Sequence, residues 1–289
     1  MHDDGNASAS ARDLLLRWQA DLEGWAIPAE ILAKAPESPW VLPRQVFARR
    51  ADRLAAAPAG PSFERAWAAL DPPGSVLDVG AGAGAASLPL LPRCTWLTAV
   101  DTDGQMLALL GERAAAAGRP ARLAEGTWPE AAAGAGLADV VTCHHVAYNA
   151  QRIEPFLTAL TAAARRIVVV EMTDVHPLVS LNDLWLRFHG LQRPLGPSAD
   201  DLLAILGALG IAARHERWRR PGGADYASFD ELTDVTRRRL CLPPSRSADV
   251  ASALTESGID PGRPVDLGSS GREVVTIWWP GRPQTRPTP

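Results

Sequence analysis

The chain has 289 residues and a formal net charge of −4 at pH 7, with 46% hydrophobic and 21% charged residues. These ordinary values for a globular protein provide no overall electrostatic reason to expect nucleic acid or an anionic membrane as a partner. The three cysteines form no C-x-x-C pair, which argues against a disulfide framework or a zinc site and favours a reducing cytoplasm. Neither a signal peptide nor a membrane-spanning segment is expected.

The first 70 residues are expected to form a helical extension. Residues 1–11 are small and polar and are expected to be frayed. From Ala11 to Trp25, leucines and tryptophans recur at helical spacing. Three further helices are expected to begin at prolines, which suit the first turn of a helix: Pro28, Pro43 and Pro61.

From residue 75 onward, apolar runs alternate with helical segments, which predicts an α/β domain with a parallel sheet covered on both faces. Strands are expected near 75–79, 95–100, 120–124, 138–143 and 166–172. Helices are expected near 83–91, 103–117 and 152–164. Further elements are expected near 198–209 (helix), 211–218 (strand), 228–241 and 247–257 (helices) and 273–279 (strand).

The predicted organisation has a helical extension, a core and two insertions. Its boundaries are 1–70 (extension), 71–175 (core), 176–197 (inserted amphipathic segment), 198–218 (core), 219–272 (helical insertion), 273–280 (last core strand) and 281–289 (disordered tail). No internal repeat is visible.

A glycine-rich stretch, Ser75-Val-Leu-Asp-Val-Gly-Ala-Gly-Ala-Gly-Ala85, follows the first apolar run. The pattern predicts a buried strand that turns sharply into a helix whose first N–H groups point into a crevice. Gly80-x-Gly82-x-x-Ala85 also fits the dinucleotide pattern G-x-G-x-x-G/A. By itself the stretch indicates a nucleotide-type ligand at a strand–helix turn.

The run Val-Leu-Asp-Val-Gly-Ala-Gly-Ala-Gly resembles the first motif of the S-adenosylmethionine (SAM) dependent methyltransferases with a Rossmann-like fold. In that family an acidic residue precedes the first glycine by two positions, as Asp78 does. A carboxylate there suits the ammonium group of a methionine-type ligand, whereas it would repel a pyrophosphate. The resemblance covers roughly residues 75–175 and the last strand. It implies a seven-stranded sheet whose last strand is antiparallel, with lid segments over the cofactor SAM.

Carried over by position, the resemblance implies these cofactor-binding residues: Asp78, Gly80, Gly82, Gly84, Asp101, Thr102, Met106, Thr127, Trp128 and Cys143. The glycines would contact the methionine portion. Asp101 ends the second strand, at about the spacing of an acid that binds ribose hydroxyls. Family members usually have an acid after the third strand that binds the adenine amine. Here Thr127 would accept from that amine, and Trp128 would either stack on the adenine or fill the core.

The carboxyl ends of the fourth and fifth strands carry four candidate catalytic residues: His144, His145, Tyr148 and Glu171. Adjacent residues on a strand point to opposite faces, so one histidine is expected in the pocket and the other inside the protein. Methyl transfer from a sulfonium needs alignment and a way to manage the nucleophile's proton. It requires no metal, and no metal-ligand spacing is visible.

Aromatic side chains of the lid segments are candidates for binding the methyl acceptor: Trp25, Trp40, Trp185 and Phe188, with His189 beside them. The chain is similar to actinobacterial natural-product methyltransferases. The interpretation is a bacterial, cytoplasmic enzyme that methylates a small, mostly apolar aromatic or heteroaromatic molecule. The most specific form of this interpretation is an indole-containing secondary metabolite methylated at carbon or nitrogen.

Three alternatives stay open: an RNA or protein methyltransferase that docks through arginine runs, a non-catalytic SAM-binding module, and an NAD-dependent dehydrogenase. The fourth strand is followed by Cys-His-His-Val rather than an Asn-Pro-Pro-Tyr-type motif, which counts against a methylase of adenine, cytosine or glutamine amides. The expected partner is a small molecule, without nucleic acid or membrane, and a homodimer is left open.

Overall fold

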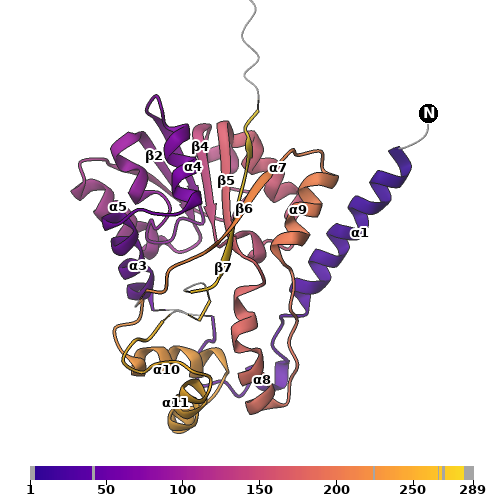
Figure 1. The fold of residues 1–289 in the computed structure, drawn as a ribbon, viewed down its shortest axis with the longest axis vertical. Helices are drawn as coiled ribbons and strands as arrows, with labels where there is room; N and C mark the ends of the chain where they lie inside the picture. Colours follow the sequence, from indigo (N-terminus) through magenta and orange to yellow (C-terminus); the bar gives the residue numbers. More distant parts are fainter. Residues whose placement is uncertain (1–3, 41–42, 224, 266, 269–270, 283–289) are drawn as a thin grey trace, which may run out of the picture.

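The computed structural model describes residues 4–40, 43–223, 225–265, 267–268 and 271–282. Seven strands form one sheet in the order β3-β2-β1-β4-β5-β7-β6 (Figure 1). They are β1 (Gly74–Val79), β2 (Cys94–Asp101), β3 (Ala121–Glu125), β4 (Ala138–His144), β5 (Ala164–Thr173), β6 (Arg214–Arg219) and β7 (Glu273–Pro280). β7 is antiparallel to both β5 and β6, and the other neighbours are parallel. The predicted Rossmann-like α/β class, with its antiparallel last strand, is therefore confirmed.

Helices flank this sheet and extend beyond its ends. They are α1 (Asp4–Glu23), α2 (Ala29–Leu32), α3 (Arg44–Ala56), α4 (Pro61–Ala69), α5 (Gly104–Ala116), α6 (Ala132–Ala135), α7 (Ile153–Ala163), α8 (Asn182–His189), α9 (Ala199–Ala208), α10 (Phe229–Arg239) and α11 (Ser247–Glu256). Short 3-10 helices occupy 88–93, 147–149, 177–181 and 244–246. Several helices begin at a side chain that accepts from the first free N–H groups, as Asp103 does for α5 and Ser198 for α9.

The two faces of the sheet carry separate cores because alternate side chains of a strand point to opposite faces. Leu77 and Val141 lie in the core covered by α1, α7 and α9. Val76 and Val140, one position earlier, lie in the core covered by α3, α4 and α5. The central strands are buried on both sides, which explains why they appear in the sequence as continuous apolar runs.

A third core lies below the carboxyl ends of the strands in Figure 1, among α8, α10 and α11. Helix α3 belongs to two cores, since Val46 packs into this third core and Ala51 into the sheet core. It therefore spans from the sheet to the helical unit. Among the described helices, none is both long enough and apolar enough to cross a membrane.

Two local predictions are wrong. Helix α1 begins at Asp4, so residues 4–11 are helical rather than frayed. The helix expected at 83–91 is replaced by turns and a 3-10 helix at Leu88–Arg93. Gly84 has a φ of 94°, which no α-helix accommodates, and Pro89 and Pro92 lack the N–H groups that an α-helix needs. The part of the expected disordered tail beyond residue 282 lies outside the described residues.

Candidate functional site

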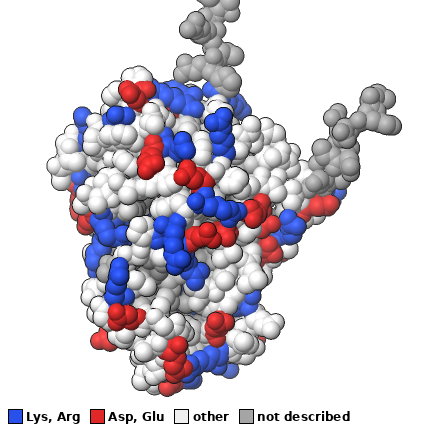
Figure 2. Space-filling model, viewed as in Figure 1, with Lys and Arg blue, Asp and Glu red and all other residues white. Residues whose placement is uncertain are grey.

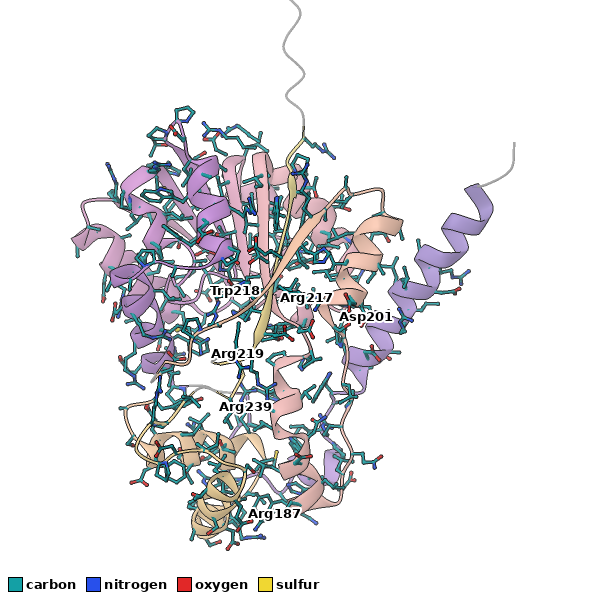
Figure 3. The ribbon with its side chains drawn as sticks, viewed as in Figure 1. Arg187, Asp201, Arg217, Trp218, Arg219 and Arg239 are labelled. Carbon is teal, nitrogen blue, oxygen red and sulfur yellow. The ribbon has the colours of Figure 1, made fainter. Side chains whose placement is uncertain are left out.

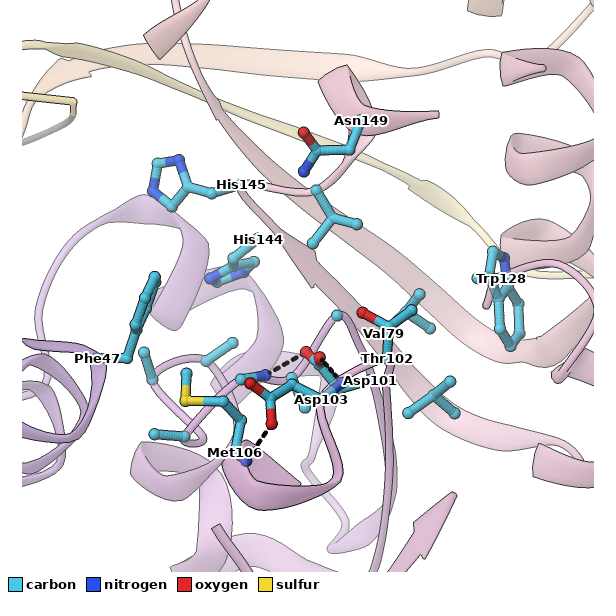
Figure 4. A pocket seen from close by; sticks show the side chains of 18 of the residues that line it. Phe47, Val79, Asp101, Thr102, Asp103, Met106, Trp128, His144, His145 and Asn149 are labelled. Carbon is cyan, nitrogen blue, oxygen red and sulfur yellow. Dashed lines mark hydrogen bonds between the residues drawn. The ribbon is translucent and has the colours of Figure 1, made fainter. Parts of the chain in front are cut away.

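A cavity of about 580 Å³ lies at the carboxyl ends of β1, β2, β4 and β5, and residues of α3 also line it (Figure 4). This volume falls in the usual range for small-molecule sites. Its position also follows the rule that open α/β sheets bind ligands beyond the carboxyl ends of their strands. The lining includes the glycine turn with the end of β2, the loop 126–128 after β3, residues at the ends of β4 and β5 with Arg220 beyond β6, and one side of α3.

Gly80 and Gly82 line the cavity with backbone alone, at φ values of 69° and 52°. A Cβ atom on Gly80 would lie 2.2 Å from Cγ2 of Val146, so a side chain would not fit there. The N–H groups of Gly80 and Ala81 both donate to the carbonyl of Val100, at 2.8 and 3.0 Å. The helix expected after this turn is absent, and the N–H groups of Gly80 and Ala81 bind the end of β2.

The carboxylate of Asp101 holds the backbone of the glycine turn through hydrogen bonds. Its Oδ2 accepts from the N–H of Gly82 at 2.8 Å, and its Oδ1 accepts from the N–H of Asp103 at 2.9 Å. Each carboxylate oxygen can accept more than one hydrogen bond, so both oxygens can also accept from hydroxyl groups of a ligand. Asp103 caps α5 and also pairs with Arg44 of α3 at 2.9 Å. This ion pair connects α3 to the start of α5 beside the cavity.

Four further residues of the predicted cofactor set line the cavity: Thr102, Met106, Thr127 and Trp128. Trp128 lies at the far side of the cavity from Met106 in Figure 4. Its indole N–H donates to the carbonyl of Phe156 at 3.3 Å, and its ring also packs against the core. Thr127 donates to Glu130 at 2.8 Å. Trp128 thus packs against the core as one expectation had it, while it also lines the cavity.

Three members of the predicted cofactor set lie outside the cavity lining. Asp78 is buried behind the turn and accepts from Thr142 at 3.0 Å. Gly84 lies against Leu88 and Leu110, and the absence of a side chain lets these leucines pack closely on the turn. Cys143 is fully buried in the sheet core, and burial raises the pKa of its thiol.

His144 and His145 both contribute to the cavity lining, where one of them was expected inside the protein, and Nε2 of His144 is itself buried. His144 is the last strand residue and His145 already lies outside the strand. The φ of His145 is 60°, a conformation that non-glycine residues rarely adopt, and it redirects the chain after the strand. The N–H of His145 donates to the carbonyl of Glu171 at 2.7 Å, which holds this conformation.

The polar residues at the ends of β4 and β5 form a connected chain. Nδ1 of His145 is 3.0 Å from the hydroxyl of Tyr148, and its Nε2 is 3.0 Å from Oε1 of Glu171. Arg220 donates to the same Oε1. Glu171 is 2% exposed and Arg220 is 8% exposed. The carboxylate is therefore stabilised by its protein partners rather than by solvation. We call these residues, Tyr148, His145, Glu171 and Arg220, the polar chain.

His144 has a different environment from its neighbour. Burial, together with the positive charges of His145 and Arg220, lowers the pKa of His144 to about 3. Its imidazole is therefore neutral near pH 7. Nε2 of His144 is buried and has no hydrogen-bond partner among the described residues.

The predicted acceptor-binding residues divide into two groups. Trp40 lines the cavity and is 53% exposed at its mouth. The other four belong to the helical surroundings instead. Trp25 stacks on His176 and donates to the carbonyl of Gly196. The remaining three are associated with the third core: Trp185, Phe188 and His189, the last bonded to the carbonyl of Leu240.

Several lining residues escaped the sequence analysis: Arg44, Phe47, Arg50, Leu54, Asn149 and Arg220. Phe47 and Leu54 were visible only as apolar positions of a helix in the extension. Their spacing of seven residues indicates a common helix face. Nothing in the sequence connects Arg220 with Glu171. Within the described residues, no group of three or more His, Cys, Asp or Glu side chains is arranged to hold a metal ion.

Residues 76–168 match the protein-family model described as a methyltransferase domain. No curated protein sequence matches the chain. Among solved structures, the chain is similar to the YcgJ protein from Bacillus subtilis, with 18% identity and a TM-score of 0.48 over 72% of this chain and 92% of that one.

Two further similar structures contain S-adenosylhomocysteine (SAH). Magnesium protoporphyrin IX methyltransferase from Synechocystis PCC 6803 is 19% identical, with a TM-score of 0.44 over 60% of this chain and 76% of that one. The plantazolicin methyltransferase BpumL is 11% identical, with a TM-score of 0.44 over 96% of this chain and 99% of that one.

Proposed function

We propose that this chain uses SAM to methylate a small, mostly apolar aromatic or heteroaromatic acceptor in the cavity that α3 helps to line, since residues 76–168 match the model of a methyltransferase domain. The observation that carries the proposal is that two sets of lining residues differ in chemistry. The first set, which we call the first side, has the bare backbone of Gly80 and Gly82 together with the carboxylate of Asp101. The second set, the second side, combines His145, Glu171 and Arg220 with the apolar side chains of α3.

The residues of the first side fit SAM. The glycine turn lets a ligand approach the backbone, and the carboxylate of Asp101 retains acceptor capacity for ribose hydroxyls. Met106 provides apolar surface and Trp128 aromatic surface at opposite sides of the cavity in Figure 4, and either could pack against an adenine ring. When bound, SAM supplies an electrophilic methyl group on a sulfonium. Asp78 would act through its charge from behind the turn, because it does not line the cavity.

The second side supports a flat acceptor. Phe47, Trp40 and Leu54 offer aromatic and apolar surface on the α3 side of the cavity. Rings packed against rings prefer such surroundings, which favours an aromatic or heteroaromatic molecule. An indole-containing natural product is the most specific acceptor that we propose.

An RNA or protein acceptor would need the arginine runs as a docking surface. Arg237 is only 2% exposed and donates to Glu37 and Asp234. Arg217 on β6 is paired with Asp174 and Asp200 (Figure 3). On the face drawn in Figure 2, basic and acidic side chains lie next to one another. These pairings support the small-molecule proposal.

The direct test is to incubate the protein with SAM that carries a labelled methyl group and with host extract. The extract is then separated into solvent-soluble, RNA and protein fractions. Label in the solvent-soluble fraction is expected, and mass spectrometry would then identify the acceptor. Label confined to RNA or protein would contradict the proposal. Binding of SAM without any labelled product would favour a non-catalytic module, and thermal stabilisation by NAD but not SAM would favour a dehydrogenase.

Asp101→Ala is expected to weaken SAM binding at least about tenfold, because hydrogen bonds to a charged group are worth roughly 1.5–3 kcal/mol. Isothermal calorimetry with SAM measures the effect. Asp249→Ala is the matched control, since Asp249 is an exposed aspartate of α11 that pairs with Arg246. Unchanged affinity in the Asp101 variant would remove this residue from the site.

Trp40→Ala is expected to raise KM for the acceptor roughly three- to tenfold while leaving SAM binding unchanged, because aromatic contacts contribute about 0.5–1.5 kcal/mol beyond their buried area. The matched control is Trp96→Ala, since Trp96 on β2 is 55% exposed, as Trp40 is 53% exposed, but does not line the cavity. Steady-state kinetics with the acceptor identified by labelling provide the measurement. Equal effects of the two substitutions would contradict a role for Trp40.

A further inference from the structure

We propose that His144 determines the specificity for the acceptor: Nδ1 of its imidazole forms a hydrogen bond with an uncharged hydroxyl or ring N–H group of that molecule. This inference rests on the proposed methyl transfer and names the class of acceptor that the same cavity would take.

His144 reaches the cavity from the centre of the sheet. It is the last residue of β4, a strand that pairs with β1 on one side and with β5 on the other. Its ring is half-buried and contributes to the cavity lining (Figure 4). The charges of His145 and Arg220, both on the second side of the cavity, act on this ring. His144 is therefore placed within reach of a molecule bound at the second side.

The imidazole of His144 has hydrogen-bonding capacity that no described residue uses. Nε2 is buried and has no partner in the described part of the chain. Nδ1 makes no hydrogen bond there either, but it does not share the burial of Nε2, so it is the ring nitrogen that stays accessible from the cavity. Because the great majority of buried polar atoms in folded proteins have partners, an unpaired imidazole on a cavity wall indicates that a bound molecule supplies one.

The surroundings of His144 keep its ring uncharged. Burial first, and then the positive charges of His145 and Arg220, lower its pKa to about 3. At physiological pH the ring therefore offers one N–H donor and one lone pair, and the tautomer decides which of them Nδ1 carries. A hydroxyl group can donate or accept and so fits either tautomer. A ring N–H fits the tautomer that is protonated at Nε2.

Charged acceptor groups fit this position less well. An ammonium group would meet the same positive charges that disfavour protonation of His144. A carboxylate beside the apolar side chains Phe47 and Leu54 would need a charged partner, which a neutral imidazole does not provide. The lining around His144 thus favours an aromatic acceptor with an uncharged polar group.

This selection can be tested by ¹⁵N NMR of the histidine imidazoles in protein saturated with SAH, with His144→Leu identifying the signals of His144. The probes are phenol, benzoate and benzylamine, three rings of similar size that are neutral, negative and positive at pH 7. Phenol is expected to shift the Nδ1 signal and to bind at least about fivefold more tightly than the other two, the size of one hydrogen bond. No shift with phenol, or equal or tighter binding of a charged probe at His144, would overturn the inference.

Two substitutions distinguish the ring nitrogens, because an asparagine amide lies near the position of Nδ1 and a glutamine amide near that of Nε2. With the acceptor identified by labelling, His144→Asn is expected to keep kcat/KM within about threefold, whereas His144→Gln and His144→Leu lower it roughly ten- to 100-fold with SAH affinity unchanged. The matched control is His215→Leu, which removes an exposed histidine of β6. Equal losses in the asparagine and glutamine variants, or full activity of His144→Leu, would contradict the role of Nδ1.

The free protein provides a measurement that does not depend on turnover. His144→Leu is expected to raise the urea midpoint of unfolding, because leucine replaces a side chain with an unpaired buried nitrogen. A lower midpoint would indicate that His144 serves the fold rather than a ligand. Absence of labelled product with the wild-type protein would instead contradict the proposed function, and the titration with the three probes still decides the role of His144.

Discussion

Glu171→Gln is expected to lower the free energy of unfolding by about 3–5 kcal/mol at pH 7, because it removes the charge of a buried carboxylate that accepts from Arg220 and lies 3.0 Å from Nε2 of His145. The substitution preserves the shape of the side chain, so the loss reports the charge. Both residues are almost fully buried at the end of β5 and just beyond β6. Urea denaturation followed by circular dichroism provides the measurement.

The double variant Glu171→Gln/Arg220→Met is expected to recover part of this loss, since replacing a whole buried ion pair costs much less than breaking it. An exposed pair serves as control. Arg187 at the end of α8, labelled in Figure 3, and Glu256 of α11 are 45% and 61% exposed, and Glu256→Gln should have a much smaller effect because solvent screens this pair. If Glu171→Gln cost no more than Glu256→Gln, the pair would not have the energetic role inferred from its burial.

Asp78→Asn is expected to stabilise the SAM-free protein at pH 7.5 and to weaken SAM binding at least tenfold. Burial raises the pKa of Asp78 from 3.8 to about 6, although hydrogen bonds from Ser87 and Thr142 oppose the shift. The folded protein therefore retains a proton that the unfolded chain loses above pH 4. Stability falls as the pH rises from about 4 to 6, by roughly 3 kcal/mol for about two pH units. The asparagine side chain does not ionise and avoids this loss.

The negative charge of the Asp78 carboxylate should favour binding of a ligand that carries an ammonium and a sulfonium group. SAM affinity of the wild-type protein is accordingly expected to fall as the pH decreases through 6, and the affinity of Asp78→Asn should be lower and independent of pH in that range. Calorimetry at pH 5, 6 and 7.5 measures both trends. A pH-independent affinity of the wild-type protein would contradict the role of this carboxylate.

Asp139 provides a control of opposite sign at the other end of β4. Burial tends to raise its pKa, but hydrogen bonds from Ser75 and the charges of Arg166 and Arg165 outweigh burial and lower it. Asp139→Asn is therefore expected to destabilise the protein at pH 7.5, with the difference disappearing as the pH falls and the carboxylate protonates. Stabilisation by both substitutions would show that burial alone does not explain the behaviour of Asp78.

The sequence by itself determined the sheet and the turn at its centre. The strands around Val76, Val140 and Val168 are continuous apolar runs. Such a run is visible in the local sequence, and it predicts a strand that is buried on both faces. The glycine turn and the acid at Asp101 are likewise local patterns, with fixed spacings from the ends of β1 and β2.

Only the tertiary structure decided which other side chains meet at the strand ends. Trp25 and Trp185 have the same aromatic character as Trp40, yet they lie in the helical surroundings, because packing between distant segments determines which face of a segment reaches the cavity. The positive φ of His145 brings both histidines into one cavity, against the alternation of a strand. Arg220 reaches Glu171 across 49 positions of sequence. Local spacing constrains neighbours along the chain, whereas such long-range pairings depend on how the completed sheet and α3 enclose a common space.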